Sequence, residues 1–305
     1  MATFLSRRSF AAGGAALLAG SAFAASGRRV VETPLGRVEV PAEPRRVVAI
    51  DSRISLEMAL ALGLPLIGYS HSRARPWVPV PSSVPFLAAP PDLEQILMLE
   101  PDLILCPDTS AHSEWWPLAR LSRIAPALPS NHRTHWRGNL DSLAGWLQRT
   151  EAAERTITAY AEQIAGLRQH HNGVLRRSLL AAATYDPLKR RLMVRSDGTG
   201  YGFVMPAQVL ADLGGRAVEA GRLGPYGEVA LESLGNVLGQ VDGVLLIDLG
   251  DHAPLALARE PLWQRLPAVR AGRVHVTQGN SIFGSVYTAH HLAGAWDALL
   301  TRMAS

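Results

Sequence analysis

A stretch of about 32 residues without proline, from 140 to 171, constrains the fold more than any other part of the chain. Its apolar side chains recur at three- and four-residue intervals, at Leu143, Trp146, Leu147, Ile157, Tyr160, Ile164 and Leu167. This period predicts one amphipathic helix. At 1.5 Å per residue such a helix spans roughly 48 Å, which is long enough to run beside two lobes. A helical hairpin broken near Thr150 is the alternative.

Short strand-like runs alternate with helical patterns on both sides of this stretch. VVAI (47–50) precedes the helical run ISLEMALALG, which Gly63 ends, and DLEQILMLE precedes the strand-like DLILC. SLLAAATY, RLMVRS, VDGVLLIDL and RVHVTQG continue the alternation later in the chain. Such alternation indicates βα units, and 305 residues exceed what one core usually supports. We therefore expect an α/β fold with two Rossmann-like lobes, joined by one long backbone helix, and a cleft between the lobes.

The expected lobes share one sequence pattern. Leu93-Glu94 begins a short helical run before a strand led by Asp102, and Leu231-Glu232 begins one before a strand led by Asp242. This repeat favours similar topology in the two halves. The chain then divides into an N-terminal lobe, a linking helix and a C-terminal lobe, at residues 25–139, 140–172 and 173–305.

Residues 1–24 have the order of an export signal. The pair Arg7 and Arg8 precedes a weakly apolar segment, which ends in the small-residue pattern Ala22-Phe23-Ala24. This order predicts a cleaved twin-arginine-type signal peptide and hence a protein free in the periplasm. After this segment the chain has no run of about 18 apolar residues, so we expect no transmembrane helix.

Several other classes of protein lack support in the sequence. Cys106 is the only cysteine, which excludes an intrachain disulfide and zinc sites with paired cysteines. Adjacent histidines, as in His170-His171 and His290-His291, point about 100° apart on a helix, so we predict no metal site. No basic run with interleaved aromatics indicates nucleic-acid binding. The Gly-rich DGTGYG (197–202) lacks dinucleotide-binding spacing, so a nucleotide-dependent α/β enzyme is only a distant alternative.

Five stretches together resemble the helical-backbone periplasmic binding proteins for siderophores, haem and cobalamin. They are LGRVEVPAEPRRVVAID (35–51), LEMALALGLPLIGYS (56–70), PDLEQILMLEPDLILC (91–106), ALESL (230–234) and PLWQRLPAVRAGRVHVT (261–277). The last stretch and RARPWV are most similar to the ferric-hydroxamate binders of that family. The resemblance implies a monomeric, non-enzymatic protein that captures an iron(III)–siderophore complex and delivers it to the permease subunits of an inner-membrane ABC importer. It implies no cofactor beyond the iron carried in the siderophore; haem or cobalamin binding is the alternative.

Ligand sites favour domain interfaces and the carboxyl ends of parallel strands, which are the loops where this family places its ligand contacts. Bulky, partly anionic chelates need aromatic walls and cationic donors. The expected ligand-binding residues are Arg73, Arg75, Trp77, Trp115, Trp116, Arg195, Tyr201, Arg222, Tyr226 and Phe283. Ala88, Gly224 and Ser281 stand where the hydroxamate binders carry an arginine and two tryptophans. A carboxylate, catecholate or mixed chelate therefore suits these residues at least as well as a hydroxamate.

The resemblance also assigns a role to the two glutamates of the repeat. Members of the family present one acidic residue on each lobe to arginines of the permease, and Glu94 and Glu232 match those places. A glutamate in a first helical turn is also favoured by the helix dipole, which is the purely structural alternative.

Overall fold

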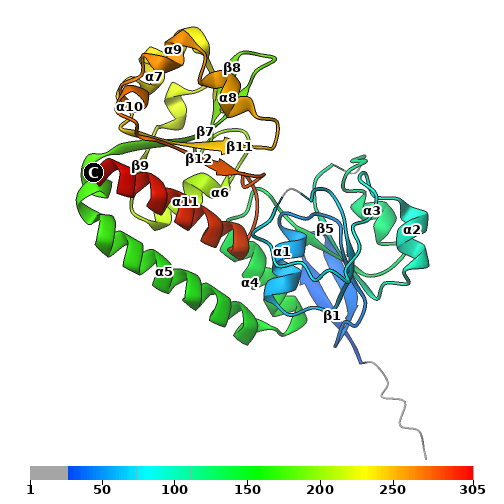
Figure 1. Cartoon of the computed structure of the whole chain (residues 1–305). Coiled ribbons are helices and arrows are strands. Elements are labelled where there is room, and N and C mark those ends of the chain that lie inside the picture. Colours follow the sequence, from blue (N-terminus) through cyan, green and yellow to red (C-terminus); the bar gives the residue numbers. More distant parts are fainter. Residues whose placement is uncertain (1–26, 74, 111, 305) are drawn as a thin grey trace, which may run out of the picture.

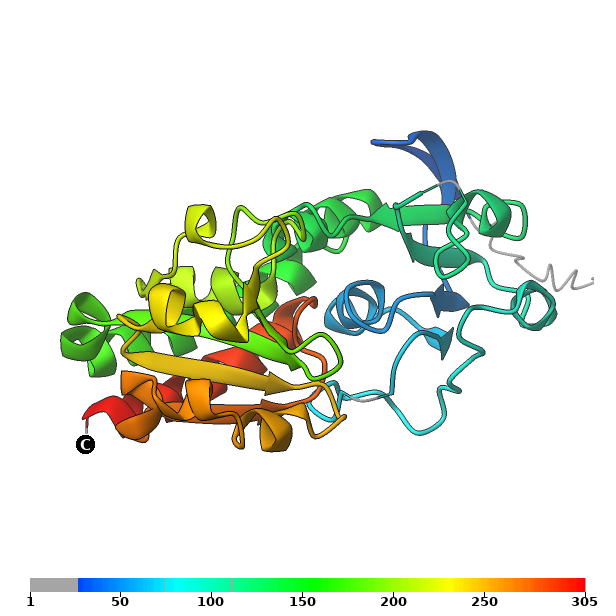
Figure 2. The ribbon, with the colours of Figure 1, turned by 90° about the horizontal axis from the view of Figure 1, so that it is seen from above.

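The computed structural model describes residues 27–304, except residues 74 and 111. Arg7, Arg8 and the whole expected export signal lie outside the described residues. Two α/β lobes lie side by side, with helices running between them (Figures 1 and 2). The expected α/β fold with two lobes is confirmed. Every helix in the described part of the chain is too short or too polar to span a bilayer.

The N-terminal lobe begins with an antiparallel hairpin of β1 (Arg28–Thr33) and β2 (Gly36–Pro41). Its main sheet is parallel, in the order β4 (Leu66–Tyr69), β3 (Val47–Ala49), β5 (Leu103–Pro107), β6 (Ala127–Ser130). Helices of this lobe are α1 (Ser55–Ala61), α2 (Leu93–Met98) and α3 (Leu118–Leu121). Gly63, with a φ of +64°, follows the end of α1, as the sequence predicts.

The C-terminal lobe has a mixed sheet, in the order β10 (Glu228–Ala230), β8 (Arg191–Val194), β7 (Leu179–Asp186), β11 (Gly243–Asp248), β12 (Val274–Gln278). The short β9 (Arg216–Ala217) also pairs with β7. β7, β11 and β12 are parallel, whereas β8 is antiparallel to β7 and β10 to β8. A four-residue turn joins β7 to β8, and a connection this short cannot make the crossover that a parallel pair needs.

Short helices cover one face of the C-terminal sheet, and α6 and α11 cover the other (Figure 1). The helices of this lobe are, in chain order, α6 (Met205–Asp212), η1 (Ala220–Arg222), η2 (Leu231–Ser233), α7 (Leu234–Leu238), α8 (Ala253–Leu257), α9 (Pro261–Gln264), α10 (Pro267–Arg270) and α11 (Val286–Ala304).

The repeat found in the sequence recurs as a repeated hydrogen-bonding device. The carboxylate of Asp102, which precedes β5, accepts the backbone N–H groups of Arg45 and Arg46 at 2.7 and 2.9 Å. Asp242, which precedes β11, accepts the N–H of Leu179 at 2.8 Å. In each lobe an aspartate thus ties the start of one strand to the start of its parallel neighbour.

The expectation of one helix over 140–171 is wrong, because the chain breaks into α4 (Trp136–Leu147) and α5 (Thr150–Arg177). Gln148 ends α4 in the left-handed region, with a φ of 53°. Its N–H donates to Gly145 and that of Arg149 to Ala144, which is the Schellman pattern of a helix end. The alternative break near Thr150 is confirmed. The 28-residue α5 is the long linking helix, about 42 Å at 1.5 Å per residue.

One hydrophobic core extends through both lobes. It joins side chains from the N-terminal sheet, the linking helices and the C-terminal lobe, including Val47, Leu103, Leu140, Tyr160, Leu180 and Trp296. α11 packs along α5, and its first turns reach α1 of the other lobe (Figure 1). Because these helices share one packed interior, the relative position of the lobes is held by side-chain packing as well as by the chain.

Candidate functional site

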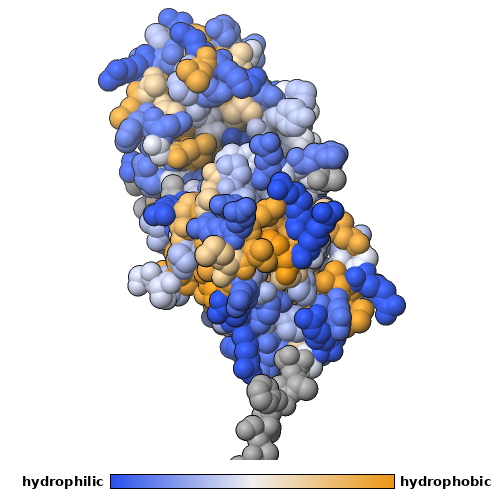
Figure 3. Space-filling view, turned by 90° about the vertical axis from the view of Figure 1, so that its right-hand side faces the viewer, coloured by the Kyte–Doolittle hydropathy of each residue, from blue (hydrophilic) through white to orange (hydrophobic). Residues whose placement is uncertain are grey.

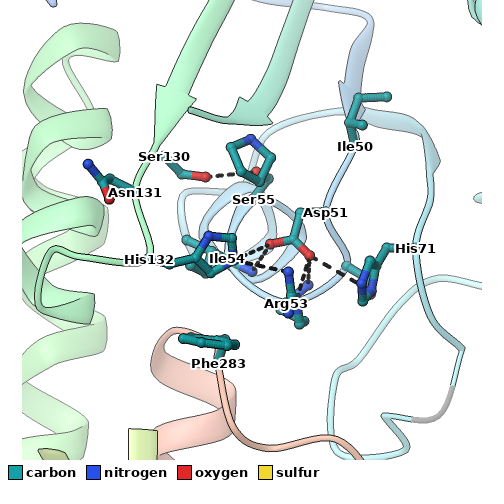
Figure 4. A network of polar contacts seen from close by, with 12 residues as sticks. Ile50, Asp51, Arg53, Ile54, Ser55, His71, Ser130, Asn131, His132 and Phe283 are labelled. Carbon is teal, nitrogen blue, oxygen red and sulfur yellow. Dashed lines mark hydrogen bonds and ion pairs between the residues drawn. The ribbon is translucent and has the colours of Figure 1, made fainter. Parts of the chain in front are cut away.

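The carboxyl ends of the N-terminal strands meet at a buried carboxylate. Asp51, which follows β3, is fully buried, and its Oδ1 accepts both the N–H and the Nε of Arg53, the latter at 2.9 Å. His132, after β6, places Nε2 3.7 Å from Asp51 Oδ2, and His71, after β4, places Nδ1 4.0 Å from Oδ1 (Figure 4). Parallel strands end at the same edge of a sheet, which is why three loops supply this cluster.

The electrostatics of this cluster follow from its burial and its charges. Burial alone would raise the pKa of Asp51, but the neighbouring guanidinium of Arg53 holds that pKa well below its usual range. Burial and the nearby Arg53 lower the pKa of His71 to about 4, against the opposing effect of Asp51. His71 is therefore neutral at neutral pH, while Arg53 and Asp51 form a charged pair.

Arg53 is also enclosed by rings from both lobes. Its Cζ lies 5.1 Å from the ring centroid of Trp116 and 5.2 Å from that of Phe283, which comes from the loop between β12 and α11. Its Nη2 lies 3.0 Å from His132 Nε2; a guanidinium only donates, so this nitrogen accepts. Phe283 packs edge-on against His132, with centroids 4.7 Å apart. The cation is thus held where the two lobes meet.

An aromatic wall adjoins this cation. The rings of His71 and Trp116 stack with centroids 5.8 Å apart, and Trp115 lies edge-on to His71 at 6.0 Å. Trp115 is 46% exposed, so much of its ring is open to solvent. The structure therefore brings together three residues singled out in the sequence, namely Trp115, Trp116 and Phe283. It adds Arg53, His71 and His132, whose one sequence signal is that each lies just after a strand.

Arg75 lies in a different environment, at the seam between the lobes. Its guanidinium contacts the carboxylate of Glu57 and the hydroxyl of Thr288, and donates to the carbonyl of Phe283 at 3.1 Å. Glu57, on α1, also accepts the N–H groups of Ser285 and Thr288 at 2.9 Å, both at the start of α11. Burial raises the pKa of Glu57, with Arg75 opposing that effect. The structure thus places Arg75 among contacts that join α1 to α11.

Arg73 and Trp77 lie two residues before and two residues after Arg75 in the sequence. The ring of Trp77 stacks on His291 of α11, with centroids 3.9 Å apart, and its Nε1 donates to Thr288 at 3.1 Å. Arg73 is exposed, and its Cζ lies 4.4 Å from the ring centroid of Phe86. Arg73 can reach a ligand without breaking an ion pair within the described residues, whereas Trp77 already packs against the second lobe.

The C-terminal lobe contributes a second group. The Cζ of Arg195, after β8, lies 4.9 Å from the ring centroid of Tyr201, and the Tyr201 ring lies 5.6 Å from that of Tyr226. The loop that carries Tyr201 touches the other half of the molecule, because Gly202 packs against the backbone at residues 132–133. Arg222 lies apart from this group: its Nη2 donates to the carbonyl of Asn236. It lines a shallow hollow beside Leu179, at the start of β7 rather than at its carboxyl end.

No group of three or more His, Cys, Asp or Glu residues within 27–304, aside from 74 and 111, is arranged to hold a metal ion. One charged and aromatic group thus lies where the two lobes meet, and a second lies on the C-terminal lobe. Sequence comparison gives the family. The profile of the family described as "Periplasmic binding protein" matches residues 55–280, and the chain belongs to that family of binding proteins, which are not enzymes.

Among similar proteins are two curated relatives. One is the iron(3+)-hydroxamate-binding protein FhuD of Escherichia coli, 26% identical over 276 residues, which covers 84% of this chain and 86% of the relative. The other is the achromobactin-binding periplasmic protein of Dickeya dadantii, 26% identical over 255 residues, with 77% and 79% covered.

Solved structures show the same fold. A periplasmic solute-binding protein from Mycobacterium smegmatis matches with a TM-score of 0.75 at 18% identity, covering 92% of this chain and 99% of that one. The siderophore-binding protein FhuD of Vibrio cholerae, bound to Fe3+–Desferal, matches with a TM-score of 0.69 at 23% identity, with 85% and 98% covered.

Proposed function

We propose that this protein captures an iron(III)–siderophore chelate between its two lobes and delivers it to an ABC importer of the inner membrane. The observation that carries the proposal is the interlobe cluster, in which Arg53 lies between Trp116 and Phe283 and beside the open ring of Trp115. Aromatic faces and a fixed cation suit a bulky, partly apolar chelate. The two curated relatives named above, which bind a hydroxamate chelate and achromobactin, support the same ligand class.

The iron in this proposal is cargo that arrives inside the siderophore. In such a chelate the siderophore itself supplies the iron ligands. The contribution of the protein is then to hold the chelate as a whole, through ring contacts and hydrogen bonds, and we propose no resident cofactor.

Fluorescence titration tests the proposed ligand class. The purified mature protein is titrated with a panel of ferric siderophores, haem and cobalamin. We expect a ferric chelate to quench tryptophan emission with sub-micromolar affinity, and Trp116→Ala to weaken that binding roughly tenfold. Trp146→Phe is the matched control, because the indole of Trp146 donates to the carbonyl of Glu32, away from the interlobe cluster. Binding of haem or cobalamin with no binding of any ferric siderophore would overturn the proposal.

Delivery requires a surface that the permease can recognise. Glu94, on α2, and Glu232, on η2, are both exposed, one on each lobe. Leu97 and Met98, on the same short helix as Glu94, are 59% and 84% exposed. Figure 3 shows apolar patches among hydrophilic side chains on the face that carries the N-terminal lobe. An acidic residue beside exposed apolar side chains is suited to a protein partner with basic residues, and we propose that the protein docks as a monomer.

Export to the periplasm by the twin-arginine route is part of the same proposal. It rests on Arg7 and Arg8 and on the small-residue pattern before residue 25. Changing both arginines to lysine is expected to keep the protein in the cytoplasm while the chain still folds. Cell fractionation with an antibody against the protein measures this, and mature-sized protein in the periplasm of the double variant would refute the route.

A further inference from the structure

We propose that Arg195 binds an anionic oxygen group of the ligand, so that the protein selects ferric chelates with net negative charge over neutral ones. This inference rests on the proposed function and specifies its ligand class. The side chain of Arg195 is 7% exposed, and its Nη2 donates to Thr184 Oγ1 at 2.7 Å. Its Nε and Nη1 are buried without a hydrogen-bond partner among the described residues.

Arg195 differs from the other buried arginines in having no carboxylate partner within the described residues. Arg53 is paired with Asp51, and Arg75 with Glu57. Arg195 has no carboxylate within 4.0 Å in the described part of the chain. Burial lowers its pKa, and the contact with Tyr201 only partly opposes that effect. A buried cation without a counter-charge destabilises a protein, so such a group is expected where a ligand supplies the missing anion.

Arg195 is one of the residues that line a hollow of about 470 Å³. Side chains of β7 and β8, the loop after β11 and Tyr201 line it. Leu180 and Ala182 of β7 face the core shared by the lobes, so by strand alternation Thr184 lies on the same face, beyond the end of that core. Arg195 thus lies on the side of the C-terminal sheet that is turned toward the N-terminal lobe.

The acidic residues of this hollow do not reach Arg195. Asp186 lies 3.8 Å from Lys189, and Asp251 accepts the N–H of Ala253 at 3.1 Å. Arg191 and Lys189 add two more cations to the lining, so that three cations face two carboxylates. The hollow therefore favours an anion next to Arg195.

The charge of the chelate distinguishes ligand classes. Iron(III) bound by three hydroxamates is neutral, because three single negative charges balance the ion. Carboxylate and catecholate complexes keep excess negative charge on their oxygens. The donors of Arg195 would gain a stronger charge-assisted hydrogen bond from the second kind of ligand, whose excess negative charge compensates the cation, whereas a chelate with no net charge would not compensate it.

Binding of three probes to the parent, Arg195→Gln and Arg195→Lys tests the inference. The probes are ferric citrate, ferric enterobactin and ferrichrome, which represent carboxylate, catecholate and neutral hydroxamate chelates. We expect at least one anionic probe to bind the parent more tightly than ferrichrome does. Arg195→Gln should weaken that probe roughly ten- to hundredfold, with Arg195→Lys in between, and should change ferrichrome binding less than about threefold.

Two measurements exclude a structural explanation. Because Arg195 has no counter-charge among the described residues, Arg195→Gln should melt at or above the temperature of the parent. Arg216→Gln, an exposed change of equal charge on β9, is the control. In the parent alone, raising NaCl from about 0.05 to 0.5 M should weaken the anionic probe more than ferrichrome.

The outcomes separate the two proposals. Preference of the parent for ferrichrome, or equal binding of the anionic probe by parent and Arg195→Gln, would overturn the role of Arg195 but not siderophore capture. A lower melting temperature in Arg195→Gln with unchanged affinity would assign Arg195 a structural role. Failure of the parent to bind any ferric chelate would overturn the proposed function and this inference with it.

Discussion

At the scale of single residues, Asp51 holds the N-terminal half of the interlobe cluster together. It accepts from the backbone of Arg53 and Ile54 and from the side chain of Arg53, with two histidines within 4.0 Å. These contacts fix Arg53 before any ligand arrives. A cation placed in advance loses little conformational freedom on binding, which favours affinity.

Replacing Asp51 by asparagine should destabilise the fold strongly at neutral pH. The change keeps the shape of the side chain but leaves Arg53, which is 7% exposed, without its counter-charge. Removing one partner of a buried ion pair costs about 3–5 kcal/mol in the free energy of unfolding. Urea denaturation at pH 7 measures the loss, with Asp141→Asn, an exposed change on α4, as control. Equal stability of the two variants would show that Asp51 is not needed by the fold.

The same pair of proteins should differ in pH dependence. Asp51 has a lower pKa in the folded chain than the roughly 3.9 of an unfolded one, so its ionised form stabilises the fold above about pH 4. That contribution is lost as the pH falls through the folded pKa. The difference in unfolding free energy between parent and Asp51→Asn should therefore shrink on acidification below about pH 4. A constant difference down to pH 2 would contradict the pKa assignment.

At the scale of elements, the break between α4 and α5 sets the direction of the linking helix. Gln148 adopts a left-handed conformation that usually belongs to glycine, and the two Schellman hydrogen bonds hold it there. The turn lets α4 pack on α5 as a separate helix and leaves α5 free to run to the C-terminal lobe (Figure 1). A continuous helix would have carried residues 136–147 away from the core that they line.

Gln148→Gly should stabilise the protein by about 0.5–1 kcal/mol. A left-handed residue with a Cβ costs roughly 1–2 kcal/mol, and the greater freedom of glycine in the unfolded chain offsets part of the gain. Gln148 is exposed, so no packing is lost. Gln148→Ala, which keeps the Cβ, should unfold within about 0.3 kcal/mol of the parent. Thermal unfolding compares the three proteins, and a less stable glycine variant would argue against strain at this turn.

At the scale of the whole molecule, the two lobes are joined by contacts as well as by chain. The carboxylate of Glu57 in the N-terminal lobe caps the first N–H groups of α11, and Arg75 bridges the same helix to its own lobe. Together with the shared core, these contacts oppose wide opening of the lobes. A partner protein that contacts both lobes at once would therefore find its two contact surfaces at a nearly constant distance from each other.

Docking by both lobes predicts separable effects of changing both Glu94 and Glu232 to alanine. Both side chains are exposed and on different lobes, so melting temperature and siderophore affinity should stay nearly unchanged. Siderophore-dependent growth should be abolished, because exposed charges fix the register of a protein complex. Alanine at Glu151, an exposed acid on α5, is the control. Normal growth, or an equal loss of ligand binding in vitro, would show that the docking role is wrong.

Much of this architecture follows from patterns that are local in the sequence. Strand-like runs with intervening helices predict the α/β lobes, and the repeated pairs at Leu93-Glu94 and Leu231-Glu232 predict their similarity, because these signals depend on neighbours along the chain. The break at Gln148 was predicted only as the alternative to one continuous helix, because neither glycine nor proline marks it. The antiparallel directions of β8 and β10 were not predicted from the sequence, although the four residues between β7 and β8 are too few for a parallel crossover.

The division between sequence and tertiary structure is sharpest in the arginines. The chemistry that the interlobe region offers, aromatic rings with cationic donors, is visible in the residues 73–77, 115–116 and 195–201. The sequence does not show which arginine is available to bind a ligand, because nothing in the residues around them distinguishes Arg75 from Arg195 in this respect. Folding brings Glu57 and Thr288, 18 and 213 positions away, to Arg75. It buries Arg195 beside Thr184 and Tyr201, with no carboxylate from residues 27–304 (74 and 111 aside) within ion-pair distance. The pairing of a buried charge depends on residues distant in sequence, so only the tertiary structure decides it.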